Sequence, residues 1–311
     1  MALDLSDVLV IGISSRALFE LEDSNDLFVK EGLEAYRKHQ FVNEKEILKK
    51  GTAFALVEAL LELNVLSDKK LVEVIVMSRN SPDTGLRVFN SIAHYGLDIS
   101  RAAFSGGTPL SPYLDAFEVD LFLSKSEEDV QAAIDAGVAA ATLYAPPQDH
   151  KLEGDKIRIA FDADAVIFSE ESEHIYKTKG LEAFLAHEAQ NVNTPMKEGP
   201  FAKLLMTLSF LQQHFEKDQS PVRIAIVTAR NSPAQERVVQ TLRTWGVSVD
   251  EAFFLGGLAK DKILEAYQAH IFFDDQDAHL VGASKLVPSG KVPYKTGSPL
   301  NTDSLTKEKN I

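Results

Sequence analysis

The sequence predicts an α/β protein with a parallel sheet that is built as two related halves. Short apolar runs rich in β-branched residues alternate with segments of helical periodicity, as in strands joined by crossover helices. In addition, four stretches of the chain recur in the same order at a nearly constant separation, which is the signature of a duplicated unit.

Strands are expected where an apolar run is short and β-branched, and helices where apolar residues return every three or four positions. A strand is expected at 119–124, because "VDLFLS" aligns with "AHIFFDD" at 269–275. The other expected strands are 7–13, 72–77, 140–144, 157–161, 223–228 and 269–273, and the expected helices include 52–64, 129–141 and 200–215.

The repeats predict the domain organisation. The matched stretches include "EGLEAYRKHQ" (31–40) with "KGLEAFLAHE" (179–188), "RNSP" at 79–82 and 230–233, and "YGLDISRAAFSGG" (95–107) with "WGVSVDEAFFLGG" (245–257). We therefore expect one α/β half at 1–150 and a second at 151–295. The polar Pro-Pro segment 145–156 would link them, and 296–311 would form a loose tail.

Composition argues against several classes of function. The formal net charge of −14 makes a nucleic acid polymer an unexpected partner, although a small anion can still bind at a local group of cations. The chain has no cysteine, so a disulfide framework is excluded and a cytoplasmic location is favoured. No apolar run reaches the ~18 residues of a membrane span, so no membrane association is expected. The acidic N-terminus is also unlike a signal peptide.

Four polar motifs occur in order in the second half. They are "FDADAV" (161–166), "VTAR" (227–230), "GLAK" (257–260) and "FFDD" (272–275). Three of them follow or end apolar runs, and the carboxyl ends of parallel strands line the ligand crevice of an open sheet. We therefore expect Asp162, Thr228 and Asp274 to lie close together although they are far apart in the chain.

These side chains suit phosphoryl transfer through an aspartyl phosphate. A carboxylate can attack phosphorus, and a second carboxylate two residues on can serve first as acid and then as base. A hard divalent cation such as Mg²⁺, bound by several carboxylates, keeps the nucleophile ionised. Thr228 and the amides that follow it can hold phosphate oxygens, and Lys260 supplies a fixed cation.

Each motif also has a structural interpretation when it is taken alone. An Asp-x-Asp after a strand can be a solvated turn, Thr228 can be a helix N-cap, and Lys260 can be a surface lysine. The internal repeat favours the functional interpretation, because the first half lacks these groups. Its aligned positions hold Ile13, Ser15, Met77, Leu110, Leu123 and Ser124.

At these motifs the sequence resembles the haloacid dehalogenase superfamily. The stretches "ISSRALF", "EGLEAY", "SIAHYGL", "FDADAVIFSEESE", "LRTWGV" and "DEAFFLGG" further resemble the cytosolic 5′-nucleotidase type I family over about residues 8–294. The resemblance implies a haloacid dehalogenase-like Rossmannoid sheet, duplicated as a degenerate N-terminal half and a catalytic C-terminal half. It also implies Mg²⁺-dependent hydrolysis of nucleoside 5′-monophosphates, with AMP the usual substrate.

The resemblance assigns a role to each motif residue. It makes Asp162 the nucleophile and Asp164 the acid and base. A cap that selects the substrate is expected near 169–200. Ala163 stands where we expect a glycine in the family, and Lys262 lies close enough to Lys260 to compete for its role. Phosphate binding falls on Thr228, Ala229 and Arg230, the motif lysine on Lys260, and metal binding on Asp162, Asp164, Asp274 and Asp275.

Alternatives to this function stay open. The chain can be a broader small-molecule phosphatase or phosphotransferase, or a nucleotide-binding protein that has lost its activity. Homo-oligomerisation is also left open by the sequence. In the first half, Arg79 aligns with Arg230 and is a candidate nucleotide contact.

Overall fold

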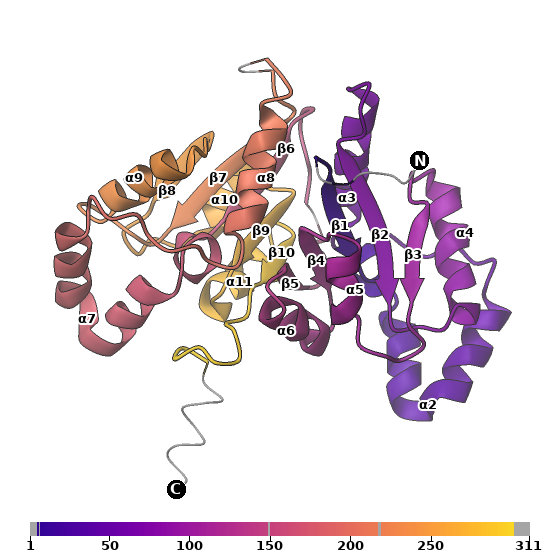
Figure 1. Cartoon of the computed structure of the whole chain (residues 1–311). Helices are drawn as coiled ribbons and strands as arrows, with labels where there is room; N and C mark the ends of the chain where they lie inside the picture. Colours follow the sequence, from indigo (N-terminus) through magenta and orange to yellow (C-terminus); the bar gives the residue numbers. More distant parts are fainter. Residues whose placement is uncertain (1–4, 6, 149, 217–218, 302–311) are drawn as a thin grey trace, which may run out of the picture.

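One continuous ten-stranded sheet runs through the molecule (Figure 1). The computed structural model describes residues 5, 7–148, 150–216 and 219–301. In chain order the strands are β1 (Leu9–Ile13), β2 (Val72–Ser78), β3 (Arg101–Phe104), β4 (Leu121–Ser124), β5 (Ala139–Leu143), β6 (Ile157–Phe161), β7 (Val222–Thr228), β8 (Glu251–Phe254), β9 (Ile271–Asp274) and β10 (Ser289–Lys291).

Helices connect these strands and cover the sheet. They are α1 (Ser15–Leu18), α2 (Glu22–Val42), α3 (Phe54–Glu62), α4 (Leu86–Tyr95), α5 (Ser111–Ala116), α6 (Glu127–Asp135), α7 (Glu171–Gln190), α8 (Ala202–Gln212), α9 (Gln235–Trp245), α10 (Asp261–Tyr267) and α11 (Asp277–Ala283). Two 3₁₀ turns, η1 (Leu63–Val65) and η2 (Asp83–Gly85), and one π turn, η3 (Ala163–Ile167), complete the elements.

The strand order is β3-β2-β1-β4-β5-β10-β9-β6-β7-β8. Neighbouring strands pair in parallel throughout, except for β5 and β10, which pair antiparallel in the middle of the sheet. The order of the first five strands is thus repeated in mirror image by the last five. The expectation of an α/β protein with a mostly parallel sheet is confirmed.

The expected strands all fall on observed ones, including 119–124, which contains β4. The expected helix 129–141 is wrong at its end. α6 stops at Asp135, and Gly137 follows in the left-handed region (φ 88°), which ends the helix. The alanines from Ala139 onward then form the buried strand β5.

The two parts of the sheet share a core. Tyr144 N donates to Ser289 O (3.0 Å) where β5 meets β10. α3, from the N-terminal part, contacts β6, and α8, from the C-terminal part, contacts β1. Apolar residues from both parts belong to one buried cluster, so neither part packs its apolar face alone.

Two long helices extend from the two ends of the molecule (Figure 1). α2 follows β1 and α1, and α7 follows β6 and its turn. Each helix is broken at a glycine in the left-handed region, Gly32 (φ 84°) in α2 and Gly180 (φ 81°) in α7. α7 lies within the segment where the cap is expected.

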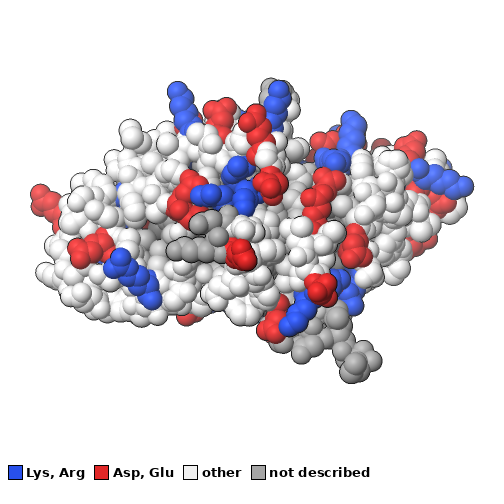
Figure 2. Space-filling view, turned by 90° about the horizontal axis from the view of Figure 1, so that it is seen from above, with Lys and Arg blue, Asp and Glu red and all other residues white. Residues whose placement is uncertain are grey.

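The surface mixes charges of both signs. In Figure 2, Lys and Arg side chains are interspersed with Asp and Glu over a largely uncharged face. Among the described residues, no helix combines the length and the apolar character that crossing a membrane requires.

The joint between β5 and β10 depends on a close backbone approach at Gly290. A Cβ at this position would lie 2.9 Å from Ala141 Cβ and 3.2 Å from Leu143 Cδ2. We predict that Gly290→Ala lowers the free energy of unfolding by about 1–3 kcal/mol through overpacking. Urea denaturation followed by circular dichroism measures this loss.

Gly297→Ala is the matched control, because a Cβ there meets no atom within 4 Å. Its stability should equal or slightly exceed that of the parent chain. Equal stabilities for the two variants would contradict the role assigned to the close approach at Gly290.

Candidate active site

Three neighbouring strands end at the residues that the sequence singles out. Asp162 directly follows β6, Thr228 ends β7 and Asp274 ends β9, and β6 lies between β9 and β7 in the sheet. All three residues are buried. Lys260 precedes α10 and reaches the same place, since its Nζ lies 3.0 Å from Asp162 Oδ1 and 2.7 Å from Asp274 Oδ2. The structure therefore brings these residues together.

The chain turns sharply just after Asp162. Asp162 N donates to Phe273 O (2.8 Å), which continues the sheet by one residue, and Asp162 Oδ1 then accepts a hydrogen bond from Ala163 N (2.7 Å). In the π turn that follows, Ala165 adopts φ 58°, a left-handed conformation that costs a residue with a side chain about 1–2 kcal/mol. Such strain concentrates at functional sites, and here it lies directly after Asp164.

A first group of buried charges surrounds Lys260. It contains Asp162, Asp274 and Asp275, and His279 Nδ1 lies 3.0 Å from Asp274 Oδ2. Burial, with the nearby Asp274, raises the pKa of Asp162 against the attraction of Lys260. Burial and the charges of Asp274 and Asp162 raise the pKa of Asp275 well above its usual value. Burial opposes the charge of Asp274 too, but Lys260 and His279 hold its pKa below the usual value.

The balance of charge in this group fits a divalent cation. The single ammonium of Lys260 pairs with Asp162 and Asp274, and Asp275 lies close enough to interact with both of these acids, so two negative charges are left over when all three acids are ionised. Buried charge of this kind is costly unless it is paired or binds a metal. Ligand atoms of Asp162, Asp274 and His279 lie within 4.8 Å of one another. Asp275 Oδ1 is buried and, within the described part of the chain, has no hydrogen-bond partner.

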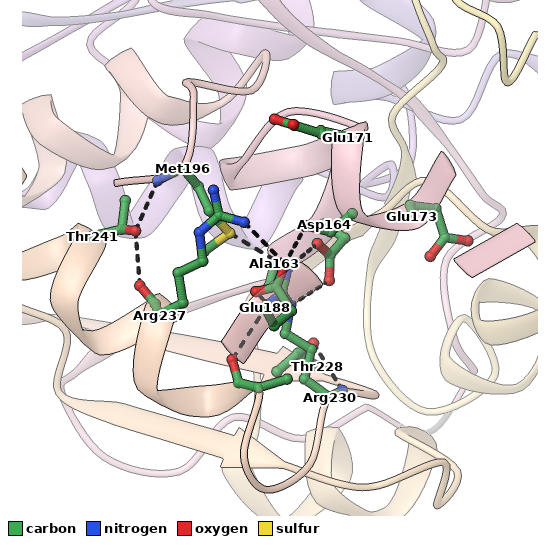
Figure 3. A network of polar contacts seen from close by, with 12 residues as sticks. Ala163, Asp164, Glu171, Glu173, Glu188, Met196, Thr228, Arg230, Arg237 and Thr241 are labelled. Atoms are coloured by element: carbon green, nitrogen blue, oxygen red, sulfur yellow. Dashed lines mark hydrogen bonds and ion pairs between the residues drawn. The ribbon is translucent and has the colours of Figure 1, made fainter. Parts of the chain in front are cut away.

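A second group of buried charges is centred on Arg230 (Figure 3). Arg230 donates through Nε and Nη2 to the two oxygens of Asp164, at 2.7 and 2.6 Å. Arg230 Nη1 also pairs with Glu188 of α7, and Glu188 accepts from Arg237 Nη1 of α9 at 3.0 Å. Two carboxylates thus face two guanidinium groups, and this group is neutral by itself. It ties α7 to the turn that carries Asp164.

The predicted phosphate-binding residues lie at the end of β7. Thr228 Oγ1 accepts a hydrogen bond from Arg230 N (3.2 Å). Ala229 is exposed between two buried neighbours. The Arg230 side chain contacts Asp164 and also stacks over Phe184, with 5.2 Å between its Cζ and the ring centroid. Burial opposes its charge, but the two carboxylates raise the Arg230 pKa above its usual value.

The four predicted metal-binding acids are divided between the two groups. Asp162, Asp274 and Asp275 surround Lys260, whereas the Asp164 side chain is occupied by Arg230. Lys260 contacts the acids, whereas Lys262 is exposed and its backbone N–H donates to Asp261 Oδ1 at 2.8 Å.

Sequence reasoning missed several polar residues of the site. These are Glu188, Arg237, His279 and Tyr294, whose hydroxyl donates to Asp275 Oδ2. The internal repeat held a signal for Glu188. The stretch that ends at Glu188 matches one that ends at Gln40, so a buried negative charge is present at this place in the second half and absent from the first.

The structure corrects the positions that were aligned between the halves. Ser14 N donates to Leu123 O as Asp162 N donates to Phe273 O, so Ser14, and not Ile13, stands in the place of Asp162. The other places are then Ser78 for Thr228 instead of Met77, and Ser124 and Lys125 for Asp274 and Asp275 instead of Leu123 and Ser124. Ser15 corresponds to Ala163 rather than to Asp164, because Phe19 N donates to Ser15 O and Phe168 N donates to Ala163 O.

Two extra residues in the second half explain the error. Ser78 and Thr228 pair with Phe104 and Phe254 in the same way, yet one further residue, Ala229, separates Thr228 from the shared "RNSP". The turn after Asp162 is likewise one residue longer than the turn after Ser14, measured to Phe168 and Phe19. An alignment anchored on the shared motifs is therefore displaced by one residue at the strand ends.

Comparisons with known proteins agree with these features. A family model described as 5′-nucleotidase matches residues 1–299. Cytosolic 5′-nucleotidase 1B of Homo sapiens is 38% identical over 291 residues, which cover 90% of this chain and 48% of the human protein. The chain thus spans about half the length of this curated relative.

Solved structures show weaker likeness. A chain described as "Structure of Pnkp1/Rnl/Hen1 complex" has a TM-score of 0.34 and 11% identity, covering 93% of this chain and 97% of that one. Histidinol dehydrogenase from Elizabethkingia anophelis has a TM-score of 0.23 and 10% identity, covering 79% and 50%. TM-scores this low do not establish a shared fold or function. The match of the family model over nearly the whole chain, together with the identity to the human protein, shows that this chain belongs to the 5′-nucleotidase family.

Proposed function

We propose that this chain is a Mg²⁺-dependent 5′-nucleotidase that hydrolyses nucleoside 5′-monophosphates, AMP above others, to nucleoside and phosphate. Family membership and the name of the human relative support the reaction class. The observation that carries the proposal is the group around Lys260, where buried Asp162 lies beside Asp274 and Asp275 with an excess of negative charge. A divalent cation would supply the positive charge that this group lacks and would also attract the anionic phosphate ester.

Asp162 is the proposed nucleophile. Its carboxylate oxygen forms a bond to phosphorus while the bond from phosphorus to the 5′ oxygen of the nucleoside breaks. Water then attacks the aspartyl phosphate, which releases phosphate and restores the carboxylate. Lys260 is held 3.0 Å from Asp162 Oδ1, where its charge offsets the negative charge of the transferred group.

Asp274 and Asp275, with Asp162, are the proposed metal-binding acids. A bound Mg²⁺ would neutralise the phosphate and keep Asp162 ionised. Asp274 is linked to Asp162, the proposed nucleophile, because both carboxylates contact Lys260 Nζ. The buried Asp275 Oδ1 has a free acceptor among the described residues, which suits either the metal or a water molecule bound to it.

Asp164 is the proposed acid and base. As long as it is ionised and paired with Arg230, it can accept a proton but cannot donate one. Proton donation to the leaving 5′ oxygen therefore requires the pair between Asp164 and Arg230 to open. The substrate phosphate is the anion that would draw Arg230 away, which joins the predicted phosphate-binding role of Arg230 to the role of Asp164.

We further propose a haloacid dehalogenase-like sheet that arose by duplication. The mirrored strand order and the matched hydrogen bonds of Ser14 and Asp162 support it. In this proposal residues 1–150 form the degenerate half and 151–295 the catalytic half, with α7 as the substrate-selecting cap near 169–200.

Thr296, at the start of the proposed tail, donates to Asp135 Oδ1 (2.8 Å), and residues 302–311 lie outside the described part. A cytoplasmic location is supported by the name of the human relative.

The proposed function is tested by phosphate release. A panel of nucleoside 5′-monophosphates and simple sugar phosphates, assayed with Mg²⁺ and with EDTA, should give the highest kcat/KM for AMP and no release in EDTA. Equal rates on sugar phosphates would show a broader phosphatase, and no release from any compound would show a protein without activity.

Asp162→Asn should abolish turnover and leave the protein folded, because an amide has almost the same shape as the carboxylate but is a poor nucleophile. Phosphate release and circular dichroism measure the two effects. Asp98→Asn, at an exposed position, is the control and should keep full activity. Substantial phosphate release by a folded Asp162→Asn protein would rule out the covalent route.

Asp164→Asn should slow the reaction by roughly 10²–10⁴-fold, since the amide cannot transfer protons. The slowing should be smaller for substrates with a good leaving group, such as p-nitrophenyl phosphate, because these need no proton from the enzyme. Loss of the same size on both kinds of substrate would argue that Asp164 only positions Arg230.

Asp274→Ala should raise the Mg²⁺ concentration needed for half-maximal rate by about 10–100-fold, a range seen when groups around a metal are removed. Titration of the rate with Mg²⁺ at saturating AMP gives this value for the variant and the parent chain. An unchanged Mg²⁺ requirement would exclude Asp274 from the metal site.

A further inference from the structure

We propose that the first half contains a second binding site, which takes a phosphate ester bearing a flat apolar group, needs no metal and carries out no reaction. A cavity of about 540 Å³ lies at the carboxyl ends of β1, β2 and β4, the place that corresponds to the candidate active site. Small-molecule sites in proteins span roughly 300–1,000 Å³, so the cavity has the size for such a ligand.

The charges at the corresponding positions are reversed between the two halves. Ser14 and Ser124 replace Asp162 and Asp274, so two carboxylates become hydroxyls. Lys125 takes the place of Asp275, and Arg16 lies in the turn after Ser14 as Asp164 lies in the turn after Asp162, so the first half has cations where the second half has carboxylates. Lys260 becomes Leu110. The second half therefore needs a cation before it can accept a phosphate, whereas the first half offers cations and hydroxyls directly. All five of these first-half residues line the cavity.

Two of the cations already converge on one anionic group. Glu22 accepts from Arg16 Nη2 at 2.8 Å and from Lys125 Nζ at 3.0 Å, and thus bridges them. The Lys125 side chain is only 10% exposed, but that of Glu22 is 49% exposed. A buried lysine is therefore held in place by a carboxylate that can swing into solvent. A phosphate group can take the place of Glu22 between Arg16 and Lys125.

A third cation, Arg79, adds to the positively charged lining of the cavity. Arg79 follows β2 and pairs with Asp129 (2.5 Å) and Glu128 (3.0 Å). Its Nε, like that of Arg16, is buried and has no hydrogen-bond partner among the described residues. Both guanidinium groups thus retain a donor that their present partners do not use. The sequence had singled out Arg79 as a nucleotide contact.

Apolar and aromatic side chains also line the cavity. Phe28 and Tyr36 of α2 meet edge to face, with ring centroids 6.0 Å apart, and Leu21 and Leu33 also line the cavity. Phe28 is 46% exposed and Leu33 is 50% exposed, so these side chains present apolar surface to solvent. A flat ring packed against them would bury this surface. Cations and exposed aromatic surface in one cavity match a phosphate ester with a ring.

The test uses AMP as the probe, because AMP carries both groups. Asp162→Asn protein in EDTA is titrated with AMP, with inorganic phosphate and with adenosine by calorimetry. Lys125→Met in this background should weaken AMP binding by roughly tenfold or more, the loss expected for a charge-assisted hydrogen bond. Phe28→Ala should weaken the binding of AMP but leave that of phosphate unchanged.

Glu22→Gln should tighten AMP binding, because it removes the competing carboxylate and keeps the cations. A gain of affinity cannot arise from misfolding, so this variant guards against a trivial result. Lys203→Met, whose side chain is 76% exposed and lies outside the cavity, should have no effect.

The proposal is overturned if AMP does not bind in EDTA, or if Lys125→Met and Glu22→Gln leave its affinity equal to that of Lys203→Met. Because no turnover is measured, this result is independent of the reaction proposed for Asp162. A failure of phosphate release with intact binding in the first half would remove the proposed reaction and leave the second site in place.

Discussion

The arrangement of the second half depends on the ammonium group of Lys260, which lies between the buried carboxylates of Asp162 and Asp274. Without it, two like charges would be held together at the end of neighbouring strands with no compensation. Removing one partner from a buried pair typically costs about 3–5 kcal/mol, because the other charge stays buried and unpaired. Lys260 therefore offsets the cost of burying Asp162, the proposed nucleophile, while the additional carboxyl group of Asp275 suits the proposed cation.

The neutral group around Arg230 has a different task. It joins three segments that are distant in sequence, through Asp164 in the turn after β6, Glu188 in α7 and Arg237 in α9. A change in the position of α7 must alter the contacts of Arg230, and through them those of Asp164. The two groups of charges interact, because the charge of Asp164 contributes to the raised pKa of Asp162, so a rearrangement around Arg230 also acts on the group around Lys260.

The two halves share their main structural elements but differ in the residues at the candidate site. The strands, the "RNSP" turn and the glycine pair are common to both halves. Gly106 N donates to Asn80 O and Gly256 N donates to Arg230 O, and each acceptor lies two residues beyond the end of β2 or β7. The differences are a few side chains at the strand ends and two additional residues in the second half. The proposed function therefore rests on these positions rather than on the sheet.

Much of the fold could be predicted from apolar runs, because buried parallel strands are apolar on both faces. β3 and β8 were not predicted because they lie at the sheet edges and are half-exposed. β10 was not predicted because "SGK" has no apolar signal and becomes a strand only by pairing with β5 and β9. Asp162, Thr228 and Asp274 could be placed because each ends a strand. The contact between Glu188 and Arg230 could not, because it depends on how α7 bends at Gly180 and packs.

The antiparallel pairing of β5 with β10 also has a consequence for how the chain is made. A ribosome completes β5 long before it reaches β10, since Leu143 pairs with Gly290. A first half that folds during synthesis therefore carries an open strand edge, with the apolar residues that α8 later covers still exposed. Unpaired edges of this kind recruit other chains. Delay in translating the second half would thus expose the nascent protein to aggregation, and the last strand to emerge closes the sheet.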